Sequence, residues 1–357
     1  MRFPAPLALY NASYIDNKPS GIGVVARDLA CSLDPELVQV LDPIGCFPGR
    51  GIQIPNNLSP KYGTKGHLRR LLWTQNRIPE LIKQSKAEFL ISPLPEAPLL
   101  RNINSIILVH DLLPLRYPQF TPLLSYHLIY VPLVVHNSVK VLCNSEATAK
   151  ELNSRLKVPM RKIRIIPLGF DSNKLYPLKL KRKPFFLVLG RHDPHKNIAN
   201  ILIALSLLSL KDVELWFVGS HDKRYTPSLK RLASELGLGK RCKWIPWVSD
   251  HERLTLLNSC QSLIIGSLWE GFGLPAIEAM ACEAPVIASC MGALPEVVGD
   301  AGLLIEPLNP ASISDAMKNI LSDQSLCNSL AERGKERIKK YTWDKAAAIV
   351  EKTLKEI

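Results

Sequence analysis

The string from residue 270 to residue 281 is the strongest candidate for chemistry in this sequence. Two glutamates, Glu270 and Glu278, lie in it with seven residues between them. The residues that follow the first glutamate form a glycine-rich turn: Gly271, Phe272, Gly273 and Leu274. Pro275 suits the first position of a helix, so the amides of the turn and of the helix N-terminus are expected to form an anion site. The two carboxylates would accept hydrogen bonds from sugar hydroxyls.

A plain strand-to-helix connection is the alternative interpretation of this string. Glu278 is expected in the first turn of the helix, where a carboxylate complements the helix dipole without any ligand. That alternative explains Glu278 by itself better than it explains the whole string. The sequence contains no Asp-x-Asp pair, so the anion site is expected to work without a metal.

A basic loop is predicted at the end of another strand. Arg191 and Lys196 follow Gly190 there, and they could converge on a diphosphate, the arginine as a planar fork and the lysine as a point charge. Single basic loop residues are usually solvated, which is the alternative for either residue alone. His192 and His195 lack the cysteine or paired carboxylate that would complete a metal shell, so we expect no metal.

Two weaker patterns lie in the first half of the chain. His110 and Asp111 follow a buried strand over 106–109, where an imidazole could orient a sugar hydroxyl, although a structural His–Asp pair is the alternative. Residues 18–23, with Gly21 and Gly23, precede a helix expected over 24–33, and glycines there let the backbone approach a ligand. This loop is not the G-x-G-x-x-G of dinucleotide-binding proteins, and a flexible turn is its alternative interpretation.

Short apolar runs alternate with helical periodicity along the whole chain, which predicts a doubly wound α/β architecture with parallel sheets. Ligands of such sheets bind beyond the carboxyl ends of the strands. The expected strands are 7–10, 89–92, 106–109, 139–143, 163–166, 185–189, 214–218, 242–245, 262–265, 286–288 and 303–305. The expected helices include 145–152, one opened by a capping box at Ser249 and Glu252, and three near the end of the chain, over 312–321, 325–340 and 342–357.

A basic, proline-containing stretch over 173–184 separates two α/β series and is interpreted as a solvated linker. We therefore predict two α/β domains, over 1–175 and over 176–341, followed by a last helix over 342–357.

Composition excludes several classes of protein. The chain has 357 residues, 46% of them hydrophobic and 22% charged, as in globular proteins. It contains no long uninterrupted apolar run and no signal-peptide pattern, so a cytoplasmic protein is expected. Eight cysteines without a C-x-x-C pair indicate reduced thiols. The net charge is +13, of which +9 lies within residues 1–178, so anionic partners are expected.

A basic and apolar segment contributes to that excess. It contains Lys61, Lys65, His67, Arg69, Arg70 and Arg77, interleaved with Tyr62, Leu68, Leu71, Leu72 and Trp73. Such a segment suits peripheral docking at the anionic inner face of a membrane, whereas a solvated helix with an apolar core face is the alternative. No nucleic-acid-binding motif occurs, so no nucleic acid is expected as a partner.

Taken together, these strings resemble the retaining glycosyltransferases of family 4, which share the GT-B fold of two Rossmann-like domains facing across a cleft. Residues 109–115 resemble mannosyl- and related hexosyltransferases that act on bacterial surface polysaccharides. The resemblance covers essentially the whole chain. It implies a Rossmann-like domain over 1–175 on the acceptor side, a Rossmann-like domain over 176–341 that holds the donor, and a helix over 342–357 that crosses back to the first domain. It is carried by residues 21–23, 110–111, 166–171, 190–191, 196–197 and 270–281.

The resemblance implies a nucleotide-diphosphate sugar as donor, with GDP-mannose favoured, and a glycan or lipid-linked acceptor, with no further cofactor. Arg191 and Lys196 would neutralise the diphosphate. Glu278 would hold the ribose, and Glu270 with the amides of residues 272–274 would bind the transferred sugar. His110 would reach the reacting centre from the first domain, and the loop of Gly21 and Gly23 would close near the donor phosphates.

Three alternatives stay open at this point. A UDP-sugar-dependent transferase of the same family, for glucose or an N-acetylhexosamine, would use the same residues. A nucleotide-sugar epimerase shares the fold but lacks the string over 270–281. A basic nucleic-acid-binding protein would explain only the charge.

Overall fold

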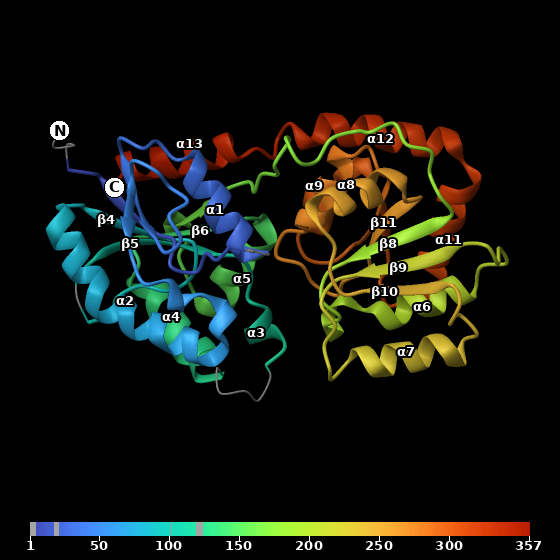
Figure 1. Ribbon diagram of the computed structural model, residues 1–357, viewed down its shortest axis with the longest axis horizontal. Helices are drawn as coiled ribbons and strands as arrows, with labels where there is room; N and C mark the ends of the chain where they lie inside the picture. The colour runs from blue at the N-terminus through green and yellow to red at the C-terminus, as the bar shows by residue number, and fades with distance from the viewer. Residues whose placement is uncertain (1–4, 18–20, 101, 119–123) are drawn as a thin grey trace. The chain divides into compact units, whose positions relative to one another are not determined.

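The computed structural model describes residues 5–17, 21–100, 102–118 and 124–357. The chain divides into two compact units (Figure 1). Unit 1 comprises Met1–Gly169 together with Thr342–Ile357, and unit 2 comprises Phe170–Tyr341. The division therefore falls between Gly169 and Phe170, a little before the boundary drawn from the sequence at residues 175 and 176.

Unit 1 is built on a seven-stranded sheet whose neighbouring strands are all parallel, in the order β3-β2-β1-β4-β5-β6-β7. The strands are β1 (Ala8–Asn11), β2 (Val38–Asp42), β3 (Gly51–Gln53), β4 (Phe89–Ser92), β5 (Asn104–Val109), β6 (Lys140–Cys143) and β7 (Ile163–Ile165). Five of them match predicted strands. The prediction was wrong in omitting β2 and β3. The edge strand β3 has only three residues, and both of its end residues are exposed.

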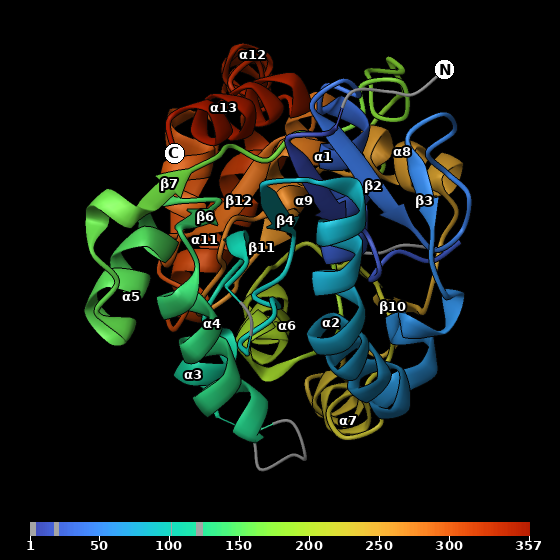
Figure 2. The same cartoon turned by 90° about the vertical axis from the view of Figure 1, so that its left-hand side faces the viewer.

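Helices cover both faces of this sheet. The helices α1 (Ile22–Ser32) and α13 (Trp343–Lys355) pack together on one face, and α2 (Gly63–Ser85), α4 (Val131–Asn137) and α5 (Glu146–Leu156) contribute to the core of the other (Figures 1 and 2). A short helix α3 (Leu113–Arg116) and a π-helical turn η3 (Tyr126–Tyr130) precede α4. The other short turns are η1 (Asn56–Leu58), η2 (Pro60–Tyr62) and η4 (Met160–Lys162).

The last helix is anchored on unit 1 by close contacts. A Cβ atom at Gly169 would lie 2.4 Å from the backbone nitrogen of Trp343, so only glycine lets the two segments approach this closely. Near the other end of the helix, Glu351 accepts a hydrogen bond of 2.8 Å from the Asp34 amide. These contacts explain why the C-terminal residues belong to the first unit.

Unit 2 is built on a six-stranded parallel sheet in the order β10-β9-β8-β11-β12-β13. The strands are β8 (Phe185–Leu189), β9 (Glu214–Val218), β10 (Cys242–Ile245), β11 (Ser262–Ile265), β12 (Val286–Ser289) and β13 (Leu303–Ile305). All six agree with predicted strands. Such short, nearly continuous apolar runs are typical of strands that are buried on both faces.

The helices of unit 2 form two layers around this sheet. The core on one face includes residues of α6 (Ile198–Ser206), α7 (Thr226–Glu235) and α11 (Pro310–Ser322). The helices α8 (Asp250–Ser259) and α9 (Leu274–Ala281) lie on the other, with α12 (Gln324–Ile338) against α9 (Figure 1). The remaining elements are η5 (Pro194–Lys196), α10 (Leu294–Val298) and η6 (Gly299–Ala301).

Two predicted helix starts are confirmed at the level of side chains. Ser249 and Glu252 form a reciprocal capping box at the start of α8, and Ser145 caps α5 through the amide of Thr148. The stretch over 173–184 was interpreted as a solvated linker, and much of it is exposed. It is nevertheless fixed to unit 2, because the Arg182 guanidinium donates to the carbonyl oxygens of Cys260 and Glu283.

The basic segment over 61–77 contains a residue that the sequence analysis misplaced. Arg70 is not on the surface of α2: its side chain is 3% exposed, and it forms a bidentate ion pair with Glu96, which is 1% exposed. Arg70 also donates to the Leu58 carbonyl, and Tyr126 donates to Glu96. A buried guanidinium requires such partners, so Arg70 belongs to the scaffold of unit 1.

Candidate functional site

The basic loop of unit 2 lies between β8 and α6 and is held by backbone and amide contacts. Gly190, at a φ of 130°, lies beside Lys196: a Cβ at this position would be 3.6 Å from the lysine Cε. Asn197 adopts a left-handed conformation at the start of α6 and donates to the carbonyl oxygens of Gly266, at 3.0 Å, and Pro307, at 2.6 Å. Asn197 thereby fixes the end of β11 against the loop that carries Lys196.

Lys196 and Glu270 meet at the carboxyl ends of β8 and β11. The Lys196 Nζ lies 2.6 Å from the Glu270 Oε1, and the Ser267 hydroxyl donates to the same oxygen at 2.6 Å. Burial raises the pKa of Glu270, but the Lys196 charge and the two hydrogen bonds outweigh this effect and leave the pKa below its ordinary value. Glu270 is therefore an ionised carboxylate held by a cation.

The turn after Glu270 is packed tightly by glycines. Gly273 has a φ of 101°, and a Cβ there would lie 2.6 Å from a methyl group of Leu294. A Cβ on Gly292 would lie 2.6 Å from the Glu270 carbonyl oxygen, which accepts a hydrogen bond from the Ala293 amide at 3.0 Å. These contacts fix the backbone that leads into α9.

Phe272, in the same turn, places its side chain inside unit 2. Its side chain is buried and packs edge to face against Tyr341, with 5.6 Å between ring centroids. The amides of residues 272–274 remain candidates for binding an anion at the start of α9.

Glu278 lies farther along α9 than the sequence analysis placed it. It is the fifth residue of the helix and not part of its first turn, because the helix begins only at Leu274. Its Oε1 accepts a hydrogen bond of 2.9 Å from Arg253 of α8. Burial raises the pKa of Glu278 and the Arg253 charge counteracts this only in part, so Arg253 favours the ionised form.

Arg191 is the most accessible of the four charged candidates in unit 2. Its side chain is 57% exposed, and its guanidinium pairs with Asp193 at 2.8 Å. The hydrogen bond to Asp193 is the main cause of a raised pKa at Arg191. Both cations that were predicted to bind a diphosphate are thus paired with carboxylates of the same unit.

His192 belongs to the same loop between β8 and α6, but its side chain lies in the core. It is buried, its Nδ1 lies 2.9 Å from the Thr226 hydroxyl, and its ring packs near those of Phe217 and Trp244. Burial, followed by the nearby His221 and Lys230, lowers the pKa of His192 to about 4. Within the part of the chain that the structure describes, no group of three or more His, Cys, Asp and Glu side chains could hold a metal ion.

His110 lies at the carboxyl end of β5 in unit 1. Its Nε2 donates to the Pro93 carbonyl at 2.9 Å, and burial lowers the pKa of the imidazole to about 4. The ring is therefore neutral at pH 7, and its Nδ1 is an acceptor. Asp111 accepts the Leu113 amide at 2.9 Å and so starts the next helical turn.

The glycine loop near the N-terminus is only partly described. Lys18, Pro19 and Ser20 lie outside the described residues. Gly21, at a φ of 50°, is the N-cap of α1, and its Cα has open space for a side chain. The helix starts at Ile22 and not at residue 24, so Gly23 is a buried residue inside its first turn.

The structure thus brings Lys196 and Glu270 into direct contact, while Arg191 and Glu278 each have another partner. His110, Gly21 and Gly23 belong to the other unit. Sequence analysis missed three partners: Ser267, Asp193 and Arg253. Ser267 and Asp193 each lie within three residues of a predicted site residue. This proximity was the only sequence signal that they could belong to the site. Arg253 lies 25 residues from Glu278 and nothing in the sequence pattern connected the two.

Two parallel, doubly wound domains of seven and six strands define the GT-B architecture, and solved structures share it. The sucrose-phosphate synthase of Thermosynechococcus elongatus has a TM-score of 0.75 at 20% identity, with 99% of each chain covered. Anabaena HepE in complex with UDP and glucose has a TM-score of 0.77 at 18% identity, covering 99% of this chain and all of its own.

Two family models match consecutive parts of the sequence. The model described as Glycosyltransferase Family 4 matches residues 19–174, and the model described as Glycosyl transferases group 1 matches residues 173–337. Together they span most of both units. The chain belongs to this glycosyltransferase family.

Among curated relatives, the MMP alpha-(1->4)-mannosyltransferase of Mycolicibacterium hassiacum is 30% identical over 58% of this chain and 52% of its own length. The O-antigen chain mannosyltransferase RfbU of Salmonella typhimurium is 29% identical over 75% of this chain and 76% of its own. The chain thus spans only about half of the first relative and three quarters of the second.

Proposed function

We propose that this protein transfers a hexose from a nucleotide-diphosphate sugar to a glycan or lipid-linked acceptor, with retention of the anomeric configuration and without a metal. The observation that carries the proposal is the contact of Lys196 with Glu270 at the carboxyl ends of β8 and β11, beside the glycine-rich turn and the start of α9. Cations, a carboxylate and backbone amides are what a sugar diphosphate requires.

The proposed reaction breaks the bond between the anomeric carbon and the diphosphate oxygen and forms a bond from that carbon to the acceptor oxygen. Negative charge grows on the leaving diphosphate, where Lys196, Arg191 and the amides of residues 272–274 would stabilise it. Glu270 would hold hydroxyls of the transferred sugar, and Glu278 those of the ribose. As a hypothesis, the acceptor proton passes to the leaving diphosphate, which would give retention without a protein base.

GDP-mannose is the donor that we favour, because two relatives bear the name mannosyltransferase. A UDP-sugar is the second candidate, because the structural neighbour HepE was solved with UDP-glucose. Nucleotide binding separates the two. Calorimetric titration with GDP, UDP and ADP in EDTA should show one nucleotide bound best, and Arg191→Ala/Lys196→Ala should lose this binding.

Lys211→Ala/Lys240→Ala is a matched control, since it removes two exposed cations of the same unit and should bind like the parent. If none of the three nucleotides binds, or if the double variant at the site binds normally, the proposed donor site is wrong. Product analysis by NMR then tests retention, and an inverted anomeric configuration would contradict it.

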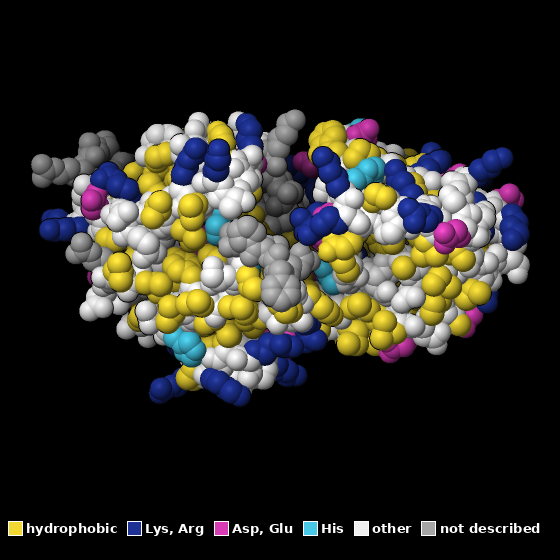
Figure 3. All heavy atoms as spheres, turned by 90° about the horizontal axis from the view of Figure 1, so that it is seen from below, with side chains coloured by type: hydrophobic (Ala, Val, Ile, Leu, Met, Phe, Trp, Pro, Cys, Tyr) yellow, Lys and Arg dark blue, Asp and Glu magenta, His cyan; other side chains and the backbone are white. Residues whose placement is uncertain are grey.

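We also propose that unit 1 docks on an anionic membrane surface, as an inner-face peripheral protein. No helix in the described part of the chain is long and apolar enough to cross a bilayer. Leu68 and Leu72 are exposed on α2, next to the exposed cations Lys65 and Arg69. Figure 3 shows hydrophobic side chains spread over the lower face of this unit, with basic side chains at its edge. Apolar and basic side chains together suit the interface of anionic lipids.

Vesicle sedimentation tests the docking surface. The parent should sediment with vesicles of phosphatidylcholine and phosphatidylglycerol at low salt, and Leu68→Ser/Leu72→Ser should weaken this. Leu207→Ser/Leu210→Ser is the control, because it removes two exposed leucines of unit 2. Absence of sedimentation at low salt would refute membrane docking and leave the proposed transfer reaction untouched.

A further inference from the structure

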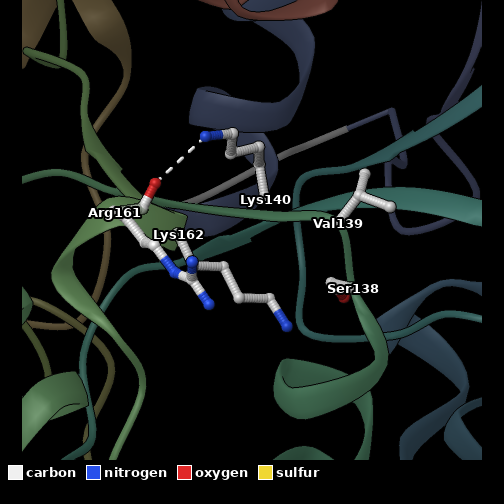
Figure 4. Close-up of a pocket in the computed structure, with 5 residues that line it drawn as sticks. All are labelled: Ser138, Val139, Lys140, Arg161 and Lys162. Carbon is white, nitrogen blue, oxygen red and sulfur yellow. Dashed lines mark hydrogen bonds between the residues drawn. The ribbon is translucent and has the colours of Figure 1, made fainter. Parts of the chain in front are cut away.

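A basic hollow of about 390 Å³ lies at the amino ends of β6 and β7 in unit 1 (Figure 4). Five residues line it: Ser138, Val139, Lys140, Arg161 and Lys162. Lys140 begins β6, and Lys162 ends the turn η4 immediately before β7. The hollow therefore lies at the amino ends of the strands, whereas His110 follows the carboxyl end of β5.

Backbone carbonyls fix the two lysines of this hollow. The Lys162 Nζ donates to the His136 carbonyl at 2.5 Å, near the C-terminus of α4, and the Lys140 Nζ donates to the Arg161 carbonyl at 3.0 Å. Figure 4 shows Lys140 reaching back to that carbonyl, while the side chains of Arg161 and Lys162 extend to one common side. An ammonium group has three donors, so each lysine keeps donors for a ligand.

Within the described structure, these cations have no acidic partner, unlike Lys196 and Arg191 of the proposed donor site. Among the described residues, no carboxylate lies within ion-pair distance of Lys140, Arg161 or Lys162. Burial lowers the pKa of the Lys162 amine, because part of its hydration is lost without an anion to replace it. Uncompensated positive charge around a hollow favours an anionic ligand.

We propose that this hollow is a second anion site, which binds a phosphate group through Arg161 and Lys162, with Lys140 holding the turn η4 in place. A guanidinium fork beside an ammonium group matches the oxygens of a phosphate. The site is separate from the proposed diphosphate site of unit 2, which uses a lysine and an arginine of that unit's own loop.

The phosphate could come from two sources. One is the headgroup of an anionic lipid: α4 ends next to the hollow, and the exposed side chains of Ile129 and Leu133, 60% and 48% exposed, lie one turn apart on η3 and α4. The other is a soluble phosphate compound. The chemistry of recognition is the same, so an experiment with two arms is needed to separate them.

The first arm titrates inorganic pyrophosphate by calorimetry into Arg191→Ala/Lys196→Ala, in which the donor site cannot contribute. The second measures sedimentation of the otherwise unaltered chain with vesicles of phosphatidylcholine and phosphatidylglycerol. We expect Arg161→Gln to weaken binding roughly tenfold in at least one arm, as the loss of a charge-assisted contact does. The arm in which this occurs identifies the source.

Arg161 is the variant of choice because its side chain makes no hydrogen bond to another described residue, whereas the side chains of Lys140 and Lys162 do. Arg161→Lys keeps the charge and should retain most of the binding. Lys150→Gln removes an exposed charge elsewhere on unit 1 and should change nothing. The proposal is overturned if neither arm shows binding, or if Arg161→Gln binds like the parent. Normal binding of the preferred nucleotide by Arg161→Gln would show that the donor site is intact, so the two proposals fail separately.

Discussion

Each unit contains an ion pair near the carboxyl end of a strand, and the two pairs differ in their exposure to solvent. In unit 1, Arg70 and Glu96 are 3% and 1% exposed, and the guanidinium and carboxylate are further bound by Leu58 and Tyr126. In unit 2, Lys196 and Glu270 are 23% and 12% exposed. Water therefore reaches the second pair more than the first. The same type of contact supports the fold in one unit and, in the proposed function, takes part in catalysis in the other.

The largest effect is expected from breaking the buried pair. Glu96→Gln leaves the Arg70 charge in the interior with too few partners, which should cost about 3–5 kcal/mol in the free energy of unfolding of unit 1. Denaturant unfolding measures it. Glu80→Gln breaks the exposed pair with Arg77 on the same helix and should cost less than about 1 kcal/mol. Equal losses from the two variants would contradict a scaffold role for Arg70 and Glu96.

The second pair should respond mainly in activity. Lys196→Ala is expected to lower kcat on the order of 10²–10³-fold, as loss of a preorganised donor to a leaving group does. Its unfolding free energy should fall less than that of Glu96→Gln, because both side chains of this pair are more exposed to water than Arg70 and Glu96 are. Turnover with the nucleotide sugar chosen by calorimetry provides the measurement. Parental turnover, or a loss of stability as large as that of Glu96→Gln, would remove the distinction between the two pairs.

A third prediction concerns His192, which lies in the loop between β8 and α6 yet is buried like Arg70. Its pKa of about 4 in the folded state is below the ordinary value near 6.5. Between these values the unfolded chain binds the additional proton, so stability falls as the pH drops below about 6.5. The expected loss from this residue is about 2 kcal/mol between pH 7.5 and pH 5.

Denaturant midpoints over that pH range test the prediction, with His192→Leu removing this share of the pH dependence. The comparison at pH 7.5, where the imidazole is neutral in both states, isolates the packing cost of the substitution. A variant whose pH profile parallels that of the parent would show that His192 is not the source of the acid sensitivity.

The smallest effect is expected at Arg253. Arg253→Gln removes the cation that favours the ionised form of Glu278, so the pKa of this carboxyl, already raised by burial, should rise further. We expect the affinity for the preferred nucleotide to fall about tenfold at neutral pH and to recover in part at higher pH, where Glu278 ionises again. Calorimetry at two pH values measures this. A loss that is the same at both values would mean that Arg253 acts by another route.

The sequence specified much of the fold because buried strands and helix caps are local features. The six strands of unit 2 and the capping box at Ser249 follow from apolar runs and residue spacing alone. The strands β2 and β3 were missed. The apolar run of β2 is broken by a glutamine and by the terminal Asp42. Asp42 is buried, and its carboxylate accepts hydrogen bonds from the following turn. The strand β3 is too short to show a pattern.

The site was predictable to the same extent. Lys196, Glu270 and the glycines around them stand at strand ends that the sequence indicates. Their partners are set by packing between elements. Arg253 reaches Glu278 from a neighbouring helix. Arg70 points inward to Glu96, although the residues around it in the sequence predict a basic surface.

The sequence by itself determined the residue types at the strand ends and the alternation that builds two parallel sheets, because both depend on neighbours along the chain. Only the tertiary structure decided which charges are paired and which are buried. The Arg70 side chain is inside, Lys196 is held by Glu270, and Arg161 and Lys162 have no acidic partner among the described residues. The physical reason is that the pKa of a charged group and the energy of its ion pairs depend on its distance from other charges and from water. Folding sets these distances between residues that are far apart in the chain.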